Sequence, residues 1–467
     1  MLMYILYQLM RGFVLFILWY VVIMSGISVL QMITALFVTP AYISGKRRLE
    51  YRLLEASANM IPISLLTPAY NEEATIVESI KTMLNVNYTN YEIVVINDGS
   101  TDNTLNKVIG AFGLHKITYP VRERLAAKKI RGIYYNPDIP RLRLIDKDNG
   151  GKSDALNAGI NLSRYPYIAT LDADSFLEPD ALFHIAMAFM QNKYTVAVGG
   201  AIRPANGCTI ANGKISGAGL PGNIWALFQT IEYFSSFLVG RIGWNGLNSL
   251  FVISGAFGAF QKEAVLQVGG FSGGTVGEDM DLVIKLHRYM RSKKYKYRVR
   301  FLPDPVCWTQ VPEKLGVLYR QRRRWQIGLI DILGRNRAMF LNPRFGLPGM
   351  LAMPYYFFFE MISPVVEIVG YILVPLAWYF GFLSLGAFVL FLAAVFAFGI
   401  ITSVGSLAVE GFTNTKYIKV KDELRLNFLS VVGNLFYRQM TVLFRLMGIL
   451  SYRKQKHVWG TKRQKIA

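Results

Sequence analysis

Long runs of apolar residues are concentrated toward the two ends of this chain of 467 residues. The stretch from Gly12 to Pro40 contains no charged residue, and a helix needs about 20 apolar residues to cross a bilayer. The run is too long for the core of a signal peptide and lacks an obvious small-residue cleavage site. It therefore predicts a permanent transmembrane helix, which we assign to residues 1–42.

Three further apolar segments lie near the other end of the chain. Residues 350–380 are long enough for one strongly bent span, or for a re-entrant piece followed by a span, and residues 383–409 form a clear span. The segment 426–450 is interrupted by Arg438 and Arg445. Charge inside a span is costly and usually functional, so this helix either has a functional charge within the bilayer or lies on its surface.

Between the apolar ends, short apolar runs alternate with segments of helical periodicity. Helical stretches such as 72–85 and 152–163 separate runs that resemble buried strands ending in polar residues. This alternation predicts an α/β domain with a mostly parallel sheet that is covered on both faces. The four clearest strand-like runs are PISLLTPAY (62–70), YEIVVINDGS (91–100), RLRLIDKD (141–148) and PYIATLDADS (166–175).

Other segments in the middle of the chain do not follow this alternation. The Gly-rich segment 199–222 is predicted to be a loop. Residues 44–56 and 311–333 are basic and amphipathic, which is typical of helices at a membrane surface. Residues 224–244 form a helical stretch that is apolar enough to lie on a membrane but too charged to cross it.

The formal net charge of +21 is best explained by membrane topology. Basic clusters at Lys46 to Arg48, Arg322 to Arg324 and Arg453 to Lys456 flank apolar runs, as the positive-inside rule expects. We prefer this interpretation to nucleic-acid binding, and it places the middle of the chain in the cytoplasm. The two cysteines, Cys208 and Cys307, lie far apart without zinc-binding spacing, so we expect two free thiols.

Polar residues follow each predicted strand, at the edge of the sheet where ligands bind in such folds. Asp172 and Asp174 end an apolar run, and residues i and i+2 of a strand point the same way. Two carboxylates facing one spot suit a hard cation such as Mg²⁺ or Mn²⁺. The alternative is a solvated turn in which Asp174 caps the next helix.

Two motifs have the composition of a nucleotide site. Asp98 to Ser100 places a carboxylate and backbone amides at a strand end, which suits a base and a ribose. The stretch NGGKSDALNAG (149–159) sets two glycines and Lys152 at a helix start, where an anion such as a diphosphate is favoured. Each motif alone is also compatible with an ordinary turn or helix cap.

Two later motifs complete the set. Glu278, Asp279 and Asp281 crowd a helix N-terminus, either as capping residues or as the source of a general base. In QRRRW, Gln321, Arg324 and Trp325 share one helix face. Arg324 there is suited to pair with phosphate oxygens and Trp325 to support a sugar ring. The alternative is an interfacial helix with an aromatic anchor.

In their order, the motifs TPAYNEE, NDGSTD, GGKSDALNAG, DAD, SGAFGAF, GED and QRRRW resemble those of the processive, membrane-embedded branch of glycosyltransferase family 2. That branch includes cellulose, hyaluronan, chitin and poly-N-acetylglucosamine synthases, and the resemblance covers nearly the whole chain. It implies a cytosolic α/β domain of the GT-A (Rossmann-like) fold over residues 43–310. Interfacial helices would follow over 311–345, and transmembrane or interfacial helices over 346–467.

The resemblance also implies a role for individual residues, which fall into donor, metal, acceptor and catalytic groups. Tyr70, Glu72 and Asp98 would hold the uridine, Lys152 and Asp154 would lie near the nucleotide and diphosphate, Asp172 and Asp174 would bind the metal and the donor, Ser254 and Gly255 would border the acceptor, Asp279 would be the catalytic base, and Gln321, Arg324 and Trp325 would close over donor and acceptor.

The function implied by the resemblance is processive, inverting transfer. A UDP-sugar, either UDP-N-acetylglucosamine or UDP-glucose, would be polymerised with Mg²⁺ or Mn²⁺ into a β-linked polysaccharide that is passed across the membrane. The enzyme would be multi-pass in the plasma membrane, with its catalytic domain in the cytoplasm. Its partners would be the donor, the growing polysaccharide and the bilayer, but not nucleic acid, and an accessory subunit or a homo-oligomer fits this picture.

Two alternatives stay open at this point. A non-processive transferase would add one sugar to a lipid or polyprenyl phosphate, although QRRRW accompanies processive relatives. A catalytically silent membrane subunit of a secretion system would have lost an acid, whereas the predicted acids are all present. Polar residues of the C-terminal spans, namely Glu360, Glu367 and Glu410, either face a channel for the product or serve packing between helices.

The chain departs from the pattern of that branch in a few places. Asn97 stands where many relatives carry the first of two acids, so uridine contact would fall to Asp98, and Gly277 replaces a common threonine before the base. The regulatory module typical of cellulose synthases is not expected after the last helices. The motif CWTQVPE around Cys307 most resembles the poly-N-acetylglucosamine synthases.

Overall fold

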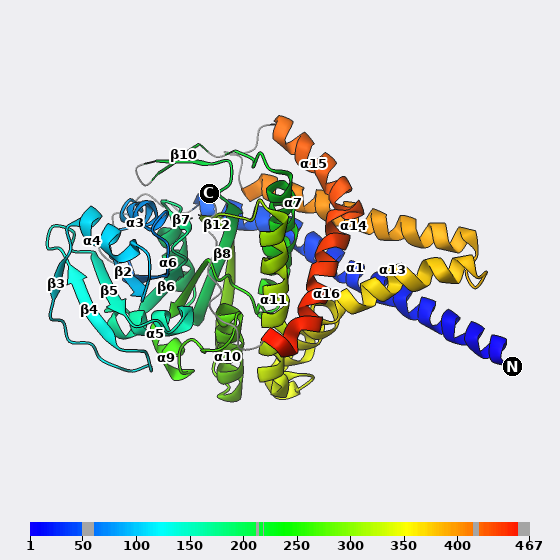
Figure 1. The fold of residues 1–467 in the computed structure, drawn as a ribbon, viewed down its shortest axis with the longest axis horizontal. Coiled ribbons are helices and arrows are strands. Elements are labelled where there is room, and N and C mark those ends of the chain that lie inside the picture. Colours follow the sequence, from blue (N-terminus) through cyan, green and yellow to red (C-terminus); the bar gives the residue numbers. More distant parts are fainter. Residues whose placement is uncertain (49–59, 212–213, 218, 414–419, 456–467) are drawn as a thin grey trace.

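The structure is a computed structural model that describes residues 1–48, 60–211, 214–217, 219–413 and 420–455. It consists of an α/β part built on one large sheet and of long apolar helices that project from one side of it (Figure 1). The predicted amphipathic stretch 44–56 lies mostly outside the described residues. Its first residues continue the N-terminal helix as far as Arg48.

Ten strands form the large sheet. In spatial order they are β3 (His115–Ile117), β4 (Ile130–Tyr135), β5 (Leu142–Lys147), β2 (Tyr91–Asp98), β1 (Ile63–Ala69), β6 (Tyr167–Leu171), β11 (Phe257–Gln261), β8 (Thr195–Pro204), β12 (Arg298–Thr309) and β7 (Ser175–Leu177). The four strand-like runs of the sequence are β1, β2, β5 and β6, and they lie next to one another in the sheet.

The four central strands are parallel, as predicted, but the sheet as a whole is mixed. β5, β2, β1 and β6 pair in parallel, and so do β8 and β12. β4 pairs antiparallel with both β5 and β3. β11 runs antiparallel to both of its neighbours, and β7 pairs antiparallel with β12. The prediction of a mostly parallel sheet is therefore wrong outside the centre, because β11 enters the sheet from a helical insertion in the reverse direction.

Alternating side chains of the central strands fill two separate cores, one on each face. Leu65 and Val95 belong to one apolar cluster, whereas Leu66 and Val94 belong to the other. All four side chains are fully buried, so both faces of the sheet are covered by helices. The helices of this part are α3 (Ile76–Leu84), α4 (Thr104–Phe112), α5 (Lys152–Leu162), α6 (Ala181–Gln191), α9 (Lys262–Gln267) and α10 (Glu278–Ser292).

The Gly-rich segment contains regular structure, so the prediction of a loop over 199–222 is wrong for most of the segment. Gly199 and Gly200 lie inside β8, where a Cβ on Gly199 would come within 2.5 Å of Ile253 and one on Gly200 would collide with Val306. These glycines permit close packing on both faces of the strand. Beyond β8, a small hairpin pairs β9 (Thr209–Ala211) with β10 (Lys214–Gly217).

Helices predicted to lie at a membrane surface connect the two parts of the molecule. The stretch 224–244 is helical throughout, with a π-helical stretch in its middle. The basic segment 311–333 forms a helix from Leu315 onward, and this helix packs along α16 (Tyr437–Gln455). In order, these elements are α7 (Ile224–Glu232), the π-helix η1 (Tyr233–Val239), α8 (Gly240–Gly246) and α11 (Leu315–Arg335).

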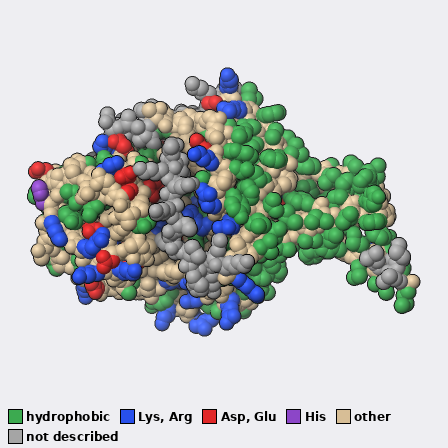
Figure 2. Space-filling model, viewed as in Figure 1, with side chains coloured by type: hydrophobic (Ala, Val, Ile, Leu, Met, Phe, Trp, Pro, Cys, Tyr) green, Lys and Arg blue, Asp and Glu red, His purple; other side chains and the backbone are tan. Residues whose placement is uncertain are grey.

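Two helices of the described chain are long and apolar enough to cross a membrane by themselves: the stretch Tyr7–Ser44 within α1 (Leu2–Arg48), and α14 (Leu385–Thr413). A third span is available if Pro348–Met361 and Ser363–Tyr379 act as one, with a bend of 44° between them. The bent pair consists of η4 (Pro348–Ala352), α12 (Met353–Tyr355), η5 (Tyr356–Met361) and α13 (Ser363–Tyr379). Hydrophobic side chains cover the projecting helices, whereas charges gather on the α/β part (Figure 2).

The weak segment 426–450 is two helices rather than one. α15 (Val420–Leu435) ends before Phe436, and α16 begins at Tyr437. The arginines that interrupt the apolar pattern are paired with carboxylates of the bent pair: Arg438 lies 3.2 Å from Glu367 and Arg445 lies 3.1 Å from Glu360. Buried or half-buried charge is thus neutralised between neighbouring helices.

Glu410 of α14 is also paired, with Arg203 at the end of β8. The two side chains lie 2.7 Å apart and are almost completely buried. Glu360, Glu367 and Glu410 therefore each form an ion pair between elements, which supports the packing interpretation. None of these pairs by itself defines a channel.

Candidate active site

The predicted site residues gather at the carboxyl edge of the central strands. β1, β2 and β6 are parallel, so Tyr70, Asp98 and Asp172, which end or follow these strands, lie along the same edge. One detail differs from the prediction. β6 ends at Leu171, and Asp172 and Asp174 lie in the turn before β7 rather than on a continuing strand.

Asp172 and Asp174 are placed by a turn, and not by their spacing of two residues on a strand. The backbone N–H of Ser175 donates to the Asp172 carbonyl at 3.0 Å, which closes the turn. The strand alternation used for the prediction does not apply there. Both carboxylates nevertheless stay partly exposed at the same strand end, and both lie near the buried thiol of Cys307, whose pKa is raised by burial and then by these two charges.

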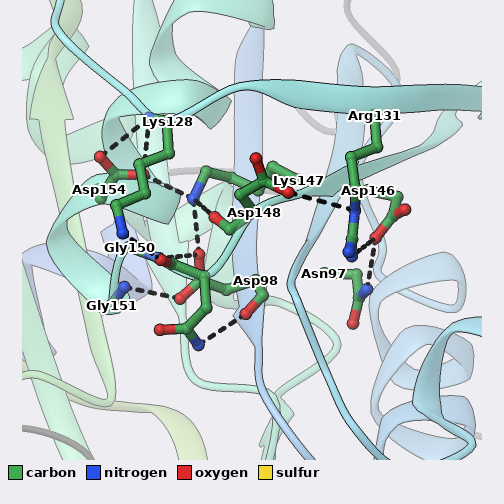
Figure 3. A network of polar contacts seen from close by, with 11 residues as sticks. Asn97, Asp98, Lys128, Arg131, Asp146, Lys147, Asp148, Gly150, Gly151 and Asp154 are labelled. Carbon is green, nitrogen blue, oxygen red and sulfur yellow. Dashed lines mark hydrogen bonds and ion pairs between the residues drawn. The ribbon is translucent and has the colours of Figure 1, made fainter.

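Asp98 holds the loop that precedes α5 (Figure 3). Its carboxylate accepts hydrogen bonds from the backbone N–H groups of Gly150 (3.0 Å) and Gly151 (2.7 Å), and its carbonyl accepts one from the Asn149 side chain at 2.8 Å. Because the Asp98 side chain is only 4% exposed, its oxygens are used mainly within the protein. A contact with uridine stays a prediction for this residue.

Lys147 neutralises this buried carboxylate. Its Nζ lies 2.6 Å from Asp98 and 2.5 Å from Asp154, and its side chain is completely buried. Asp154 in turn accepts from the backbone N–H of Lys128 at 3.1 Å. Figure 3 shows the three charged side chains pointing toward one another. A buried ammonium between two carboxylates fixes the end of β5 to the first turn of α5.

Asn97, one of the departures noted in the sequence, belongs to the neighbouring network. Its side-chain amide donates to Asp146 at 2.7 Å, and Arg131 lies 2.7 Å from the same Asp146 oxygen. An acid at position 97 would face the Asp146 carboxylate without a hydrogen to donate. The amide is therefore the side chain that this buried position accepts.

A second cluster centres on Lys152, the first residue of α5. Its Nζ lies 2.7 Å from Asp172 and 3.0 Å from Glu278, and it donates to the Gly255 carbonyl at 2.9 Å. Burial would lower the pKa of Lys152, but Asp172 and Glu278 outweigh it and raise this pKa above the ordinary value. The ammonium therefore stays charged and draws together β6, α10 and the loop before β11.

Asp279 lies at the edge of this cluster. A Cβ on Gly255 would come within 3.5 Å of Lys152 Nζ and 3.7 Å of Asp279 Oδ2, so the glycine leaves space beside the carboxylate. Burial, followed by the charge of Glu278, raises the pKa of Asp279 to about 6, against the opposing effect of Lys152. A carboxyl with that pKa is a suitable general base near neutral pH.

Arg241 of α8 adds a second cation near Asp279 and helps to keep the pKa of that carboxyl from rising further. It is buried and donates to the Ile253 carbonyl. Its guanidinium also lies 4.7 Å from the ring centre of Phe237, whose ring centre is 5.9 Å from that of Trp325. This run of contacts connects the predicted base to the QRRRW helix.

The QRRRW residues on α11 have different surroundings. Trp325 packs between Phe237 and Arg322, whose guanidinium lies 4.4 Å from the indole centre. Arg322 itself pairs with Glu232 at 2.7 Å and serves packing. Gln321 Oε1 is buried and has no hydrogen-bond partner within the described chain, whereas Arg324 is exposed. The roles of Gln321, Arg324 and Trp325 over donor and acceptor stay predictions.

The remaining predicted residues lie around the same edge. Tyr70 is exposed at the end of β1, and the backbone N–H of Glu72 donates to Thr104 Oγ1 at 2.9 Å, which joins it to the segment after β2. Ser254 Oγ accepts from the backbone N–H of Ala256 at 3.2 Å, next to Gly255. The structure thus places every predicted site residue at or next to the strand ends, or on α11.

The side chains at this site limit how a divalent cation could be held. Within the described ranges, no group of three or more His, Cys, Asp or Glu side chains is arranged to hold a metal ion. Asp172 and Asp174 therefore offer two carboxylates, and a substrate would have to supply further oxygens. Mg²⁺ is commonly bound in this way, through one or two carboxylates together with substrate phosphates, so the pair fits such a cation.

Comparison with known families agrees with this arrangement. Residues 64–215 match the model of glycosyl transferase family 2, and residues 167–400 match that of glycosyl transferase family group 2. The second match alone covers half of the chain. The chain belongs to the family 2 glycosyltransferases.

The curated relatives of this family 2 glycosyltransferase include poly-β-1,6-N-acetyl-D-glucosamine synthases. It is 32% identical over 275 residues to the one from Staphylococcus epidermidis and 34% identical over 276 residues to the one from Staphylococcus aureus (strain COL). Each alignment covers 59% of this chain and 56% of the relative. The chain therefore matches little more than half of the length of these proteins.

Among solved structures, a mannosyltransferase from Pyrobaculum calidifontis in complex with GDP-Man and Mn²⁺ is similar in fold. The TM-score is 0.50 at 18% sequence identity, over 89% of this chain and 99% of that one. At that identity the likeness concerns the fold alone. The family 2 glycosyltransferase described here has a GT-A-like mixed α/β fold.

Three site residues of this family 2 glycosyltransferase were not predicted as such. Lys147 stood in the strand-like run RLRLIDKD, where a lysine inside an apolar pattern signals a buried partner. In the sequence, Glu278 is only one of several acids at a helix start. In the sequence, Arg241 indicates only that its helix is too charged to cross a membrane, and nothing in its neighbourhood connects it to Asp279.

Proposed function

We propose that this family 2 glycosyltransferase is a membrane-bound, inverting hexosyltransferase that polymerises UDP-N-acetylglucosamine into a β-linked polysaccharide. UDP-glucose is the other donor that the sequence motifs allow. The relatives named as poly-β-1,6-N-acetyl-D-glucosamine synthases favour N-acetylglucosamine. The observation that carries the proposal is Asp279, a half-buried carboxyl with a pKa of about 6 that lies near Lys152, Arg241 and Gly255.

The chemical step would be a single displacement. Asp279 takes the proton of the acceptor hydroxyl, the acceptor oxygen forms a bond to the anomeric carbon, and the bond from that carbon to the diphosphate breaks. UDP leaves with the electron pair of the broken bond. Because the acceptor attacks the face opposite the leaving group, an α-linked donor gives a β-linked product.

The donor would lie across the carboxyl edge of the sheet. The start of α5 would border the diphosphate with Lys152, whose ammonium also holds Asp172 and Glu278, and Arg324 would supply another positive charge from α11. A divalent cation held by Asp172 and Asp174 would neutralise charge on the leaving diphosphate. Tyr70, Glu72 and Asp98 would border the uridine.

The acceptor would approach from the side of Gly255 and α11. Gly255, next to Ser254, leaves room beside Asp279, and the half-buried Trp325 would border the acceptor. Gln321 has a buried oxygen without a partner in the described structure, which suits a hydroxyl of the glycan. α1, α14 and the bent pair would surround the path of the product, with the α/β part in the cytoplasm.

The test uses the purified full chain in lipid nanodiscs. Mn²⁺ is present, and each of a panel of UDP-sugars is supplied in turn. UDP release measures transfer, and radiolabelled donor followed by size separation measures product length. We expect UDP-N-acetylglucosamine to be turned over fastest and to give long polymer. A product extended by one sugar would indicate a non-processive transferase, and no UDP release from any donor would indicate a silent subunit. Chelation of divalent cations should stop UDP release.

A further inference from the structure

A pocket of about 340 Å³ lies away from the candidate active site. It forms where β8 and β12 begin, and its lining includes Arg298, the first residue of β12. β8 runs parallel to β6, because β11 lies antiparallel between them. The pocket is therefore at the amino edge of the sheet, opposite the edge that carries Asp172. We call it the Arg298 pocket.

Every charged residue that lines the Arg298 pocket is basic. These residues are Arg291, Lys296 and Arg298, and none of them forms an ion pair with a carboxylate in the part of the chain that the structure describes. Six of the ten residues from 291 to 300 are Lys or Arg. Arg298 also repels its neighbour Arg300, whose pKa is lowered by burial and then by Arg298. The pocket thus concentrates positive charge that no protein group neutralises.

Hydrogen bonds hold one wall of the pocket in place. Tyr297 lies between His287 and Arg291: its hydroxyl is 2.7 Å from His287 Nδ1, and Arg291 Nε donates to it at 3.3 Å. His287 Nε2 is in turn 2.9 Å from the Leu250 carbonyl. Because His287 and Tyr297 are buried, the guanidinium of Arg291 is positioned by the core rather than only by solvent.

Aromatic rings line the more exposed part of the Arg298 pocket. Tyr194 and Tyr295 are largely exposed, and the Nζ of Lys296 lies 6.0 Å from the centre of the Tyr194 ring. Exposed tyrosines beside lysines are common where a protein meets the interfacial region of a membrane. A pocket of this composition accepts an anion with an adjoining organic group better than a bare ion.

The Arg298 pocket adjoins the place where the chain enters its apolar region. A Cβ on Gly346 would come within 3.2 Å of the Arg291 guanidinium, so the backbone at Gly346 packs directly against that side chain. The bent pair of apolar helices begins two residues later, at Pro348. Leu347 and Met350 expose their side chains there, as residues that contact acyl chains would.

We propose that the Arg298 pocket binds a phosphate ester, the group shared by anionic lipid headgroups and soluble phosphates. Arg291 and Arg298 present N–H donors to phosphate oxygens, Lys296 adds a third positive charge, and the tyrosines contact the esterified organic group. The position beside Gly346 favours a lipid headgroup as the source, since phosphates of that kind are concentrated at the level where the bent pair meets the membrane.

The test uses the purified full chain in neutral detergent and two probes. One probe is fluorescent phosphatidylglycerol, with fluorescent phosphatidylcholine as its neutral counterpart. The other is glycerol 3-phosphate, with glycerol as its neutral counterpart. The variant K296Q/R298Q removes two charges of the pocket, and the control variant K116Q/R122Q removes two exposed charges elsewhere on the α/β part. Circular dichroism and melting temperature show whether each variant is folded.

We expect K296Q/R298Q to lose at least tenfold in affinity for phosphatidylglycerol, and K116Q/R122Q to change less than twofold. If glycerol 3-phosphate also binds and competes with the lipid, the pocket recognises the phosphate ester itself. If only the lipid binds, the headgroup is the source. Equal losses in the two variants, or no binding of either anionic probe by the unaltered chain, would overturn the proposal. Because the readout is binding, it is independent of sugar transfer.

Discussion

Lys152 Nζ pairs with Glu278 at 3.0 Å and not with the adjacent Asp279. The ammonium thereby compensates Glu278 directly, and Asp279 is the carboxylate that we propose as the base. Asp279 keeps a pKa of about 6, raised by burial and by the neighbouring Glu278. In the first turn of α10, Glu278 thus belongs to an ion pair, whereas the adjacent Asp279 is the proposed base.

Replacing Asp279 with Asn should remove the base without adding bulk. We expect UDP release to fall by about 100-fold or more, the scale on which general-base catalysis contributes, while UDP still binds. UDP release and binding of a fluorescent UDP analogue measure the two properties. Asp138→Asn, at an exposed position, is the control. Polymer yield at the unaltered level from Asp279→Asn would show that another group takes the proton.

The pH dependence of transfer should follow the ionisation of Asp279. Its deprotonated form is the reactive one, so UDP release should rise as pH rises through about 6. Glu278→Gln removes a negative charge that raises the pKa of Asp279, and should move the inflection to lower pH. Lys152→Met removes a cation that lowers it, and should move the inflection to higher pH. Shifts in the same direction for both variants would contradict this account.

Lys147→Met should destabilise the α/β part. The substitution leaves Asp98 and Asp154 without the ammonium that lies 2.6 and 2.5 Å from them. Breaking a buried pair typically costs about 3 to 5 kcal/mol, which should appear as a large drop in melting temperature. Lys128→Met removes an exposed ammonium whose Nζ donates to the Asn149 carbonyl, and it leaves the backbone hydrogen bond to Asp154 in place. It should have little effect, and an equal drop would argue against the buried network.

Removing both members of the Arg203–Glu410 ion pair should destabilise the protein less than removing either member alone. Arg203→Met or Glu410→Leu alone leaves a charge buried without its partner, at a cost of about 3 kcal/mol or more. The double variant leaves neither charge and should recover most of the lost stability. Melting temperatures of the three proteins measure the coupling. Additive losses in the double variant would show that the two residues act separately.

The central strands and the positions of the acids could be predicted because their signals are local. Apolar runs such as those around Leu65 and Val94 define strands, and a parallel pattern places their carboxyl ends together. The turn at Asp172 and Asp174 could not be predicted in this way. Where β6 stops depends on β7, which pairs with β12 from a distant part of the chain.

The parts of the fold that were predicted wrongly also depend on contacts with residues that are distant in the sequence. Gly199 and Gly200 suggested a loop, but they are required inside β8 because Ile253 and Val306 occupy the space of their side chains. Gly277 is similar: a Cβ there would come within 2.5 Å of Ile332 on α11. In each case the residue that demands a glycine comes from another element. Composition alone therefore cannot distinguish a flexible connection from a close contact.

Arg445 on α16 contacts elements on both sides of the boundary between the two parts. Its Nε donates to Gln326 of α11 at 3.0 Å, and its Nη2 lies 3.1 Å from Glu360 in the bent pair. Gln326, in addition, donates to the Met361 carbonyl at 2.9 Å. A shift of the bent pair would therefore be transmitted to the helix that carries Trp325 through the side chains of Arg445 and Gln326.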